Sequence, residues 1–253
     1  MPKTTQIFDA FLFDMDGTLL DSLAGITAAW ELFATQYAGM DVPLLLKHIH
    51  GVRTIESLEK WVPGLTDPAD LQREATRFEK VVLDHRDANG NSGIVKLPGV
   101  DKILKALIPT DPTLPKPQWA ICTSSTHLYA SAALQRCGIP IPDVFVVAED
   151  VKVGKPNPAP YILGAEKLGI TGEKARAKCL VFEDAINGVI SGNRAGCETL
   201  AVLTTHRRDQ LVPTNPTYLV RDLSNVNVEV MADGKLKIEI ETLAPDAEPQ
   251  SHL

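Results

Sequence analysis

Two aspartates, Asp14 and Asp16, follow an apolar stretch near the start of the chain and precede Gly17 and Thr18. A carboxylate held beside a divalent cation stays ionised and can act as a covalent nucleophile, and a second carboxylate can serve as general acid and base. Glycine lets the backbone turn sharply, and threonine adds a hydroxyl and a local donor. The pattern therefore indicates nucleophilic catalysis at Asp14 with proton transfer through Asp16.

A calcium loop or a solvated turn would be a simpler interpretation of the same residues. The EF-hand loop requires glycine at its sixth position and glutamate at its twelfth, where this chain has Leu19 and Gly25. The calcium loop is therefore excluded. The solvated turn stays open, but the buried-looking strand in front of Asp14 favours catalysis.

Hydroxyl side chains follow a second apolar stretch, residues 118–122. Thr123, Ser124, Ser125 and Thr126 stand there, before a predicted helix over 128–137. Hydroxyls and free N–H groups at a helix N-terminus form an anion site. Simple N-capping explains the same cluster, and the two interpretations are compatible.

Further charged residues stand at the ends of later apolar stretches. Lys155 lies between Gly154 and Pro156, which is not a phosphate-binding P-loop because proline replaces the required serine or threonine. It would nevertheless supply a fixed inward charge. Glu183 and Asp184 end the stretch 179–182, and a third carboxylate there suits magnesium, with helix capping by Asp184 as the alternative.

One arginine and two histidines between residues 21 and 92 have side chains that could bind a ligand. Arg53 lies where a loop meets the start of a predicted helix, so its guanidinium could bind a phosphate with two hydrogen bonds, or simply face solvent. His48 and His50 resemble a metal pair only by composition. Without further ligands nearby, a surface or core position is the better interpretation of both histidines.

The elements that position these residues form a repeating pattern of strands and helices. The apolar stretch before Asp14 has little alternation, as expected of a parallel strand covered on both faces. Further strands are predicted at 118–122, 144–147, 179–182, 199–203 and 217–220, and a hairpin at 226–240. The fold class is therefore α/β, a doubly wound Rossmann-like parallel sheet, whose ligands bind beyond the carboxyl ends of the strands.

Residues 21–92, here called the insert, have helical periodicity and no strand signal. Ile26, Ala29, Trp30 and Phe33 form one apolar stripe, and a glycine- and asparagine-rich segment at 87–93 leads back. We therefore expect a catalytic core formed by residues 1–20 and 93–242, with a helical cap domain at 21–92. The polar, proline-bearing residues 243–253 are predicted to be a disordered tail.

Composition excludes several other classes of protein. The net charge of −7 argues against nucleic acid as a general partner. The four cysteines form no C-x-x-C pair, so neither a zinc site nor a disulfide framework is indicated. No apolar run reaches the roughly 18 residues that span a bilayer. We expect a cytoplasmic protein without membrane contact and, since nothing requires a partner, a monomer.

Taken together, these motifs resemble those of the haloacid dehalogenase-like hydrolases. The resemblance covers roughly residues 6–230, and the insert looks like the small helical cap of that family. The sequence around Arg53, Lys155 and Glu183 looks most like that of the fungal glycerol-phosphate and 2-deoxyglucose-6-phosphate phosphatases. The resemblance implies a Mg²⁺-dependent phosphatase acting on a small phosphorylated sugar or polyol.

The family's roles carry over to matching positions. The resemblance implies that Asp14 attacks phosphorus to form an aspartyl-phosphate, and that Asp16 protonates the leaving alcohol and later activates water. It implies Mg²⁺ ligands at Asp14, Asp16 through its carbonyl, Asp184 and, directly or through water, Glu183. Thr123 and Lys155 would bind the phosphoryl oxygens. Substrate-binding roles are expected for Arg53, Ser124 and Asn187.

Relatives with other reactions differ at single positions. Dehalogenases of the family lack the second aspartate, which Asp16 supplies here. Phosphonate-cleaving relatives use a cap lysine, whereas this chain has Arg53 in that loop. Sugar-phosphate mutases have a cap histidine where Ile26 stands. Phosphate ester hydrolysis is therefore favoured, with a phosphomutase or a non-catalytic phosphometabolite sensor as the alternatives.

Overall fold

The computed structural model describes residues 3–108 and 116–243. Its centre is a parallel sheet with strand order β6-β5-β2-β7-β8-β9. The strands are β2 (Ala10–Phe13), β5 (Trp119–Cys122), β6 (Val144–Val146), β7 (Cys179–Glu183), β8 (Glu198–Val202) and β9 (Tyr218–Val220). The expected α/β fold with a doubly wound parallel sheet is confirmed.

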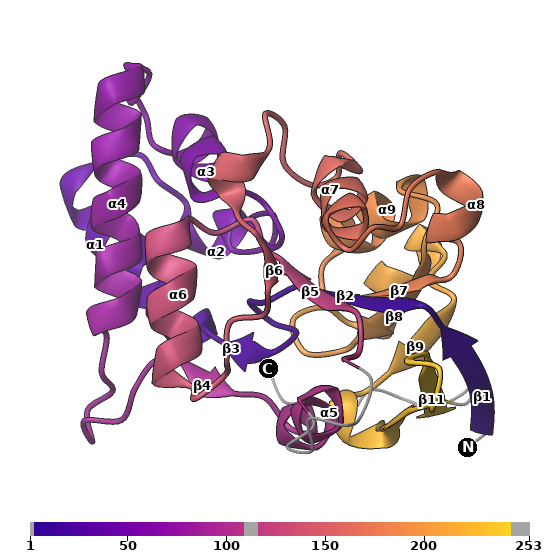
Figure 1. The fold of residues 1–253 in the computed structure, drawn as a ribbon. Coiled ribbons are helices and arrows are strands. Elements are labelled where there is room, and N and C mark those ends of the chain that lie inside the picture. The colour runs from indigo at the N-terminus through magenta and orange to yellow at the C-terminus, as the bar shows by residue number, and fades with distance from the viewer. Residues whose placement is uncertain (1–2, 109–115, 244–253) are drawn as a thin grey trace.

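Both faces of the central strands are covered, which explains their unbroken apolar sequences. Every residue of β2, β5 and β7 is buried. Along β2, Phe11 and Phe13 belong to the core cluster that contains helix α5 (Val100–Leu107) and helix α6 (His127–Arg136). The alternate residues Ala10 and Leu12 pack with helix α7 (Ala159–Lys167) on the opposite face. Figure 1 shows α5 below the sheet and α7 above it.

The remaining helices lie in the connections between the later strands. Helix α9 (Ile186–Arg194) follows β7 and lies beside α7 (Figure 1). The other short helices are α8 (Glu173–Arg176), α10 (Arg208–Leu211), η1 (Ala148–Asp150), η2 (Val212–Thr214) and η3 (Leu223–Asn225).

The first apolar stretch is not one strand, as the sequence predicted, but two. Strand β1 (Lys3–Phe8) ends before Asp9 and pairs antiparallel with β11 (Leu236–Glu241), which in turn pairs with β10 (Val226–Val230). The predicted 226–240 hairpin is thus confirmed, but it forms a separate sheet with β1. Ile7 is 45% exposed, because the first residues of the stretch do not lie between two layers of helices.

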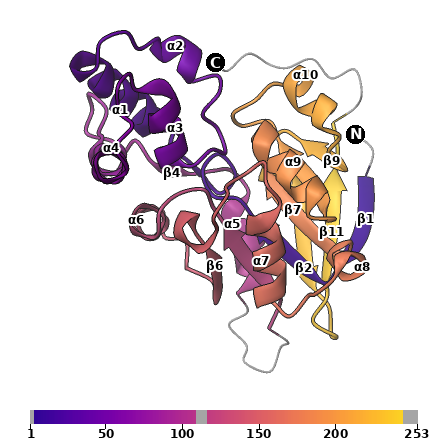
Figure 2. The ribbon, with the colours of Figure 1, turned by 90° about the horizontal axis from the view of Figure 1, so that it is seen from above.

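Four helices form the insert, and they lie at one side of the sheet (Figures 1 and 2). They are α1 (Leu23–Gln36), α2 (Val42–Leu45), α3 (Thr54–Trp61) and α4 (Pro68–Asp84). Trp30, Phe33 and Phe78 hold α1 against α4, with ring centroids 4.7 to 6.3 Å apart. At the two ends of the insert, β3 (Leu20–Asp21) pairs antiparallel with β4 (Val95–Lys96). The assignment of the insert and core as separate domains stays a prediction, and the predicted tail lies outside the described residues beyond Leu243.

Gly99 is a site where one added methyl group should destabilise the fold. Its φ is +85°, and a Cβ there would lie 2.1 Å from the carbonyl carbon of Leu223. Gly90 has a similar φ of +82°, but a Cβ would meet nothing within 4 Å. We expect Gly99→Ala to lower the free energy of unfolding by about 2 kcal/mol more than Gly90→Ala, because only Gly99 adds a backbone clash to the unfavourable φ. Urea unfolding of both variants measures the difference, and equal losses would contradict it.

Candidate active site

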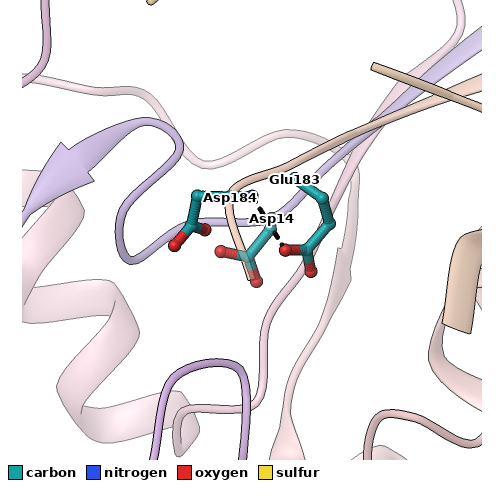
Figure 3. Close-up of side chains that lie close together, drawn as sticks. All are labelled: Asp14, Glu183 and Asp184. Carbon is teal, nitrogen blue, oxygen red and sulfur yellow. Dashed lines mark hydrogen bonds between the residues drawn. The ribbon is translucent and has the colours of Figure 1, made fainter. Parts of the chain in front are cut away.

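Three carboxylates from two adjacent strands converge at the carboxyl end of the sheet. Asp14 follows β2, while Glu183 and Asp184 stand at the end of β7, and the two strands are paired in register from Ala10 to Phe13. All three side chains are buried, and one ligand oxygen from each lies within 4.8 Å of the others. Figure 3 shows the three carboxyl groups side by side. The convergence expected of parallel strand ends is therefore present.

Lys155 supplies a positive charge to this cluster. Its ammonium donates to Asp14 Oδ1 and, at 2.8 Å, to Glu183 Oε1. Burial lowers the pKa of Lys155, but the charges of Asp14 and Glu183 outweigh burial and raise this pKa above its usual value. The lysine is thus held as a cation, although it is 1% exposed.

Glu183 has partners for both carboxylate oxygens. The hydroxyl of Tyr161 donates to Oε1 at 2.8 Å, beside Lys155. The backbone N–H groups of Asp184 and Ala185 donate to Oε2 at 3.0 Å, the first of which is dashed in Figure 3. Glu183 is therefore held in place by the core itself.

Asp184 is oriented by hydroxyls from two loops. Thr18 donates to Oδ1 at 3.0 Å, and Thr205 donates to Oδ2. Gly17 allows this approach, because its φ is +91° and a Cβ would lie 2.3 Å from Asp184 Oδ2. Burial, with the neighbouring Glu183 charge, raises the pKa of Asp184 to about 7.

The cluster fits a hard divalent cation. Burial raises the pKa of Asp14 well above its usual range, Lys155 opposes this, and the charges of Glu183 and Asp184 add to it. Three buried carboxylates thus face one ammonium, and an added cation would relieve their mutual repulsion. Carboxylate oxygens are the ligands that Mg²⁺ prefers. In the described residues, no other group of acidic, histidine or cysteine side chains gathers in this way.

Asp16 is not part of this cluster of three carboxylates, and three hydroxyls hold its side chain. Ser22 and Tyr129 donate to Oδ1 at 2.7 and 2.9 Å, and Ser125 donates to Oδ2 at 2.9 Å. Burial raises the pKa of Asp16, and these hydrogen bonds oppose the rise. Sequence reasoning missed Tyr129 and Ser22. The only signal was that Ser22 precedes a helix and that Tyr129 lies in the first turn of another.

The hydroxyl side chains that follow β5 form hydrogen bonds to groups of the core and of the insert. Thr123 is buried, and its hydroxyl accepts a hydrogen bond from the Ser125 N–H at 3.1 Å. Thr126 is the N-cap of α6 and accepts from the Tyr129 N–H. Ser124 instead donates to the carbonyl of Gly51 at 2.9 Å. N-capping is therefore observed at Thr126, and the anion site stays a prediction.

The three residues predicted to bind substrate connect the insert to the core. Ser124 bonds Gly51, and Asn187 Nδ2 donates to the carbonyl of His50 at 3.4 Å. The guanidinium of Arg53 pairs with Glu56 and donates to the carbonyls of residues 151 and 152, both at 3.2 Å. Their roles in binding substrate stay predictions.

A cavity of about 90 Å³ lies between the insert and the carboxylates. Asp14, Asp16, Thr123 and Tyr129 line its core side. The insert contributes polar side chains, among them Ser57 and Glu79, and the apolar side chains of Leu23, Ile26, Trp30, Ile49, Val52, Phe78 and Val82. The shape suits a small molecule with its reacting group at Asp14.

His48 and His50 do not join the carboxylate cluster. His48 stacks on Trp61, with ring centroids 5.8 Å apart. His50 faces His206 at 5.2 Å. The structure therefore gives both residues packing roles, as the sequence favoured.

Residues 8–196 match the family described as haloacid dehalogenase-like hydrolase. The chain belongs to the haloacid dehalogenase-like hydrolases. The resemblance seen in the motifs is confirmed, and the chain is a phosphatase of this family, a phosphoric monoester hydrolase.

Curated relatives align with most of this chain. Hexitol phosphatase A from Escherichia coli is 42% identical over 76% of this chain and 82% of its own. Glycerol-1-phosphate phosphohydrolase 1 from Saccharomyces cerevisiae is 31% identical over 90% and 89%. The yeast 2-deoxyglucose-6-phosphate phosphatase 2 is 31% identical over 92% and 95%. The expected similarity to the two fungal phosphatase groups is confirmed.

Solved structures share the fold. A hydrolase from Pseudomonas syringae has a TM-score of 0.69 at 23% identity, covering 85% of this chain and 94% of its own. A β-phosphoglucomutase from Clostridium difficile has a TM-score of 0.68 at 21% identity, with 86% and 92% covered. Both support the α/β fold with its inserted helices. Within the described residues, no helix is long and apolar enough to cross a membrane.

Proposed function

We propose that this phosphatase is a Mg²⁺-dependent phosphomonoesterase that hydrolyses a small phosphorylated sugar or polyol through an aspartyl-phosphate at Asp14. The observation that supports this most is the buried group of Asp14, Glu183 and Asp184 beside the Lys155 ammonium. The named substrates of the relatives, a hexitol phosphate, glycerol 1-phosphate and 2-deoxyglucose 6-phosphate, support the substrate class.

The first half of the reaction transfers the phosphoryl group to the enzyme. An Asp14 oxygen attacks phosphorus, the bond to the alcohol oxygen breaks, and Asp16 donates a proton to that oxygen. Lys155 and the hydroxyl of Thr123 stabilise the negative phosphoryl oxygens. In the second half, the Asp16 carboxylate takes a proton from a water molecule, which attacks phosphorus and releases inorganic phosphate with Asp14 restored.

Mg²⁺ would be held by Asp14, Asp184 and the main-chain carbonyl of Asp16. When bound, it supplies positive charge that offsets the charge of the phosphoryl oxygens. Glu183 is already bonded to Lys155, Tyr161 and two backbone N–H groups, so it assists by holding the lysine and, through water, the metal.

A phosphate-release screen tests the proposal directly. Glycerol, hexitol, hexose, deoxyhexose and nucleoside monophosphates are offered with Mg²⁺ and with excess chelator. We expect Mg²⁺-dependent release from one or more polyol or sugar phosphates. Tight binding without release would favour the sensor, and conversion of a hexose 1-phosphate into the 6-phosphate would favour the mutase. The cytoplasmic location, the monomeric state and the absence of nucleic-acid partners also remain proposals.

Tyr129→Phe tests the role of Asp16 as general acid. The Tyr129 hydroxyl bonds Asp16 Oδ1 at 2.9 Å, so its loss leaves the proton donor less well oriented. We expect kcat/KM for an alkyl phosphate to fall about tenfold. For an aryl phosphate, whose leaving group needs no proton, it should stay within about twofold. Because kcat/KM reports only the steps up to alcohol release, dephosphorylation does not obscure the contrast.

Tyr218→Phe is the matched control for this experiment. Its hydroxyl also bonds a carboxylate, that of Glu198 at 3.0 Å, but it lies on β9 away from the cavity. We expect both substrates to react at the parental rate in this variant. Equal losses for alkyl and aryl phosphates in Tyr129→Phe would show that the tyrosine supports structure rather than proton transfer.

A further inference from the structure

Glu79 is a buried carboxylate of the insert that the proposed reaction does not use. It lies on α4, is 3% exposed and lines the same cavity as Asp16. Thr54 donates to Oε1 at 3.0 Å, the Thr126 hydroxyl donates to Oε2, and the Thr126 N–H points at Oε1 from 3.4 Å. Burial raises the pKa of Glu79, and these three donors oppose the rise because they favour the ionised carboxylate.

The wall of the cavity around Glu79 has no opposite charge. Among the described residues, the acidic groups lining the cavity are Asp14, Asp16, Asp21 and Glu79, and no lysine or arginine lines it. Burial, with the nearby His206, lowers the pKa of His50 to about 4, so this lining imidazole is neutral at pH 7. Lys155 pairs with Asp14 and Glu183 at the opposite, phosphoryl end of the cavity, and Arg53 pairs with Glu56.

This charge distribution separates the two ends of a substrate. The phosphoryl end meets Lys155 and the proposed cation at Asp14, whereas the alcohol end meets the insert. There it finds apolar walls, the Ser57 and Thr54 side chains, and the negative Glu79. A neutral hydroxyl can donate to a carboxylate, but a second anion in so small a cavity would be repelled without compensation.

We propose that Glu79 is a specificity-determining residue that admits phosphate esters of uncharged, hydroxyl-bearing alcohols and rejects those whose alcohol carries a carboxylate or a second phosphate. This inference rests on the proposed phosphatase function. It adds a criterion based on the distal part of the alcohol, since Asp14 and Asp16 act only at the ester bond.

Three two-carbon substrates isolate the effect of charge. Phosphates of ethylene glycol, glycolic acid and ethanolamine differ only in a neutral, negative or positive distal group. With the wild-type enzyme and Mg²⁺, we expect kcat/KM for 2-hydroxyethyl phosphate to exceed that for phosphoglycolate by about tenfold or more. Equal values for 2-hydroxyethyl phosphate and phosphoglycolate, or a higher value for phosphoglycolate, would overturn the inference.

Glu79→Gln removes the charge while keeping the shape and an oxygen for the threonine donors. We expect kcat/KM to rise about tenfold for phosphoglycolate and to fall for phosphoethanolamine. Opposite changes for the two substrates are a mark of charge that a structural defect would not produce. Glu79→Asp keeps the charge and should keep the rejection of phosphoglycolate. Unchanged ratios, or changes in one direction for both substrates, in Glu79→Gln would overturn the inference.

A second variant covers the case in which Glu79→Gln does not fold. Ile26→Lys places a positive charge in the same cavity from α1 and leaves Glu79 in place. It should also raise kcat/KM for phosphoglycolate relative to 2-hydroxyethyl phosphate, and an unchanged ratio would count against the inference. The proposed function fails separately, if the wild-type enzyme releases no phosphate from any neutral ester.

Discussion

Replacing Asp14 with asparagine is expected to lower phosphate release by a factor of about 10⁴ or more while the protein stays folded. Asparagine has the shape of aspartate, but its amide oxygen is too weak a nucleophile to form an acyl phosphate. Lys155 keeps Glu183 as a partner, so the buried ammonium is not left alone. Phosphate release from glycerol phosphate with Mg²⁺ measures the loss. Urea unfolding checks that the free energy of unfolding stays within about 1 kcal/mol of the parent.

Asp9→Asn is the matched control for this substitution. Asp9 precedes β2 as Asp14 follows it, and it pairs with Lys235 at 3.5 Å. The same chemical change at the other end of the strand should leave the rate unaltered. An Asp14→Asn protein that hydrolyses an aryl phosphate at the parental rate would rule out Asp14 as the nucleophile.

The meeting of the three buried carboxylates at one edge of the sheet could be predicted from sequence because two rules act together. Strands covered on both faces have unbroken apolar sequences, which located the ends of β2, β5 and β7 to within a residue. Parallel strands place those ends at one edge, so Asp14, Thr123 and Glu183 had to be near one another. Chain order and strand direction were sufficient, and no side-chain detail was needed.

The first apolar stretch was wrongly predicted to be a single strand, because its apolar sequence does not show which sheet each part joins. Apolar content alone cannot show whether a strand lies between two layers of helices or belongs to a second, separate sheet. Strand β1 takes its partner from the β10–β11 hairpin, more than 200 residues later in the chain. Pairing at such separation leaves no local signal in residues 3–8.

Contacts between the insert and the core were beyond sequence reasoning. Arg53 does stand where a loop meets a helix, as the start of α3 at Thr54 shows. Where its guanidinium points depends on how the insert lies on the core. The same holds for Tyr129 against Asp16 and for Glu79 against Thr126, since each pair joins elements whose relative position no sequence period encodes.

Lys155→Met is expected to impair both activity and stability. Methionine fills much of the same space but leaves Asp14 and Glu183 buried without the ammonium between them. We expect phosphate release to fall by about 10³ or more, because a fixed charge for the phosphoryl oxygens is lost. The free energy of unfolding should fall by about 3 kcal/mol or more, as when one partner of a buried ion pair is removed. Urea unfolding without and with Mg²⁺ measures the loss, and Mg²⁺ should restore part of it.

The loss of unfolding free energy in Lys155→Met should become larger as the pH rises. Burial and the charges of Glu183 and Asp184 raise the folded-state pKa of Asp14, and without the ammonium nothing of opposite charge in the cluster counters this rise. A carboxyl whose pKa is raised by folding contributes to stability below its unfolded pKa, and this contribution is lost as the pH rises through the folded pKa. The loss of unfolding free energy in Lys155→Met should therefore be larger at pH 8 than at pH 5. Lys167→Met is the control, since that α7 lysine pairs loosely with Asp150 at 3.6 Å and is 40% exposed. A deficit independent of pH, or an equal one in the control, would show that the lysine stem and not its charge supports the site.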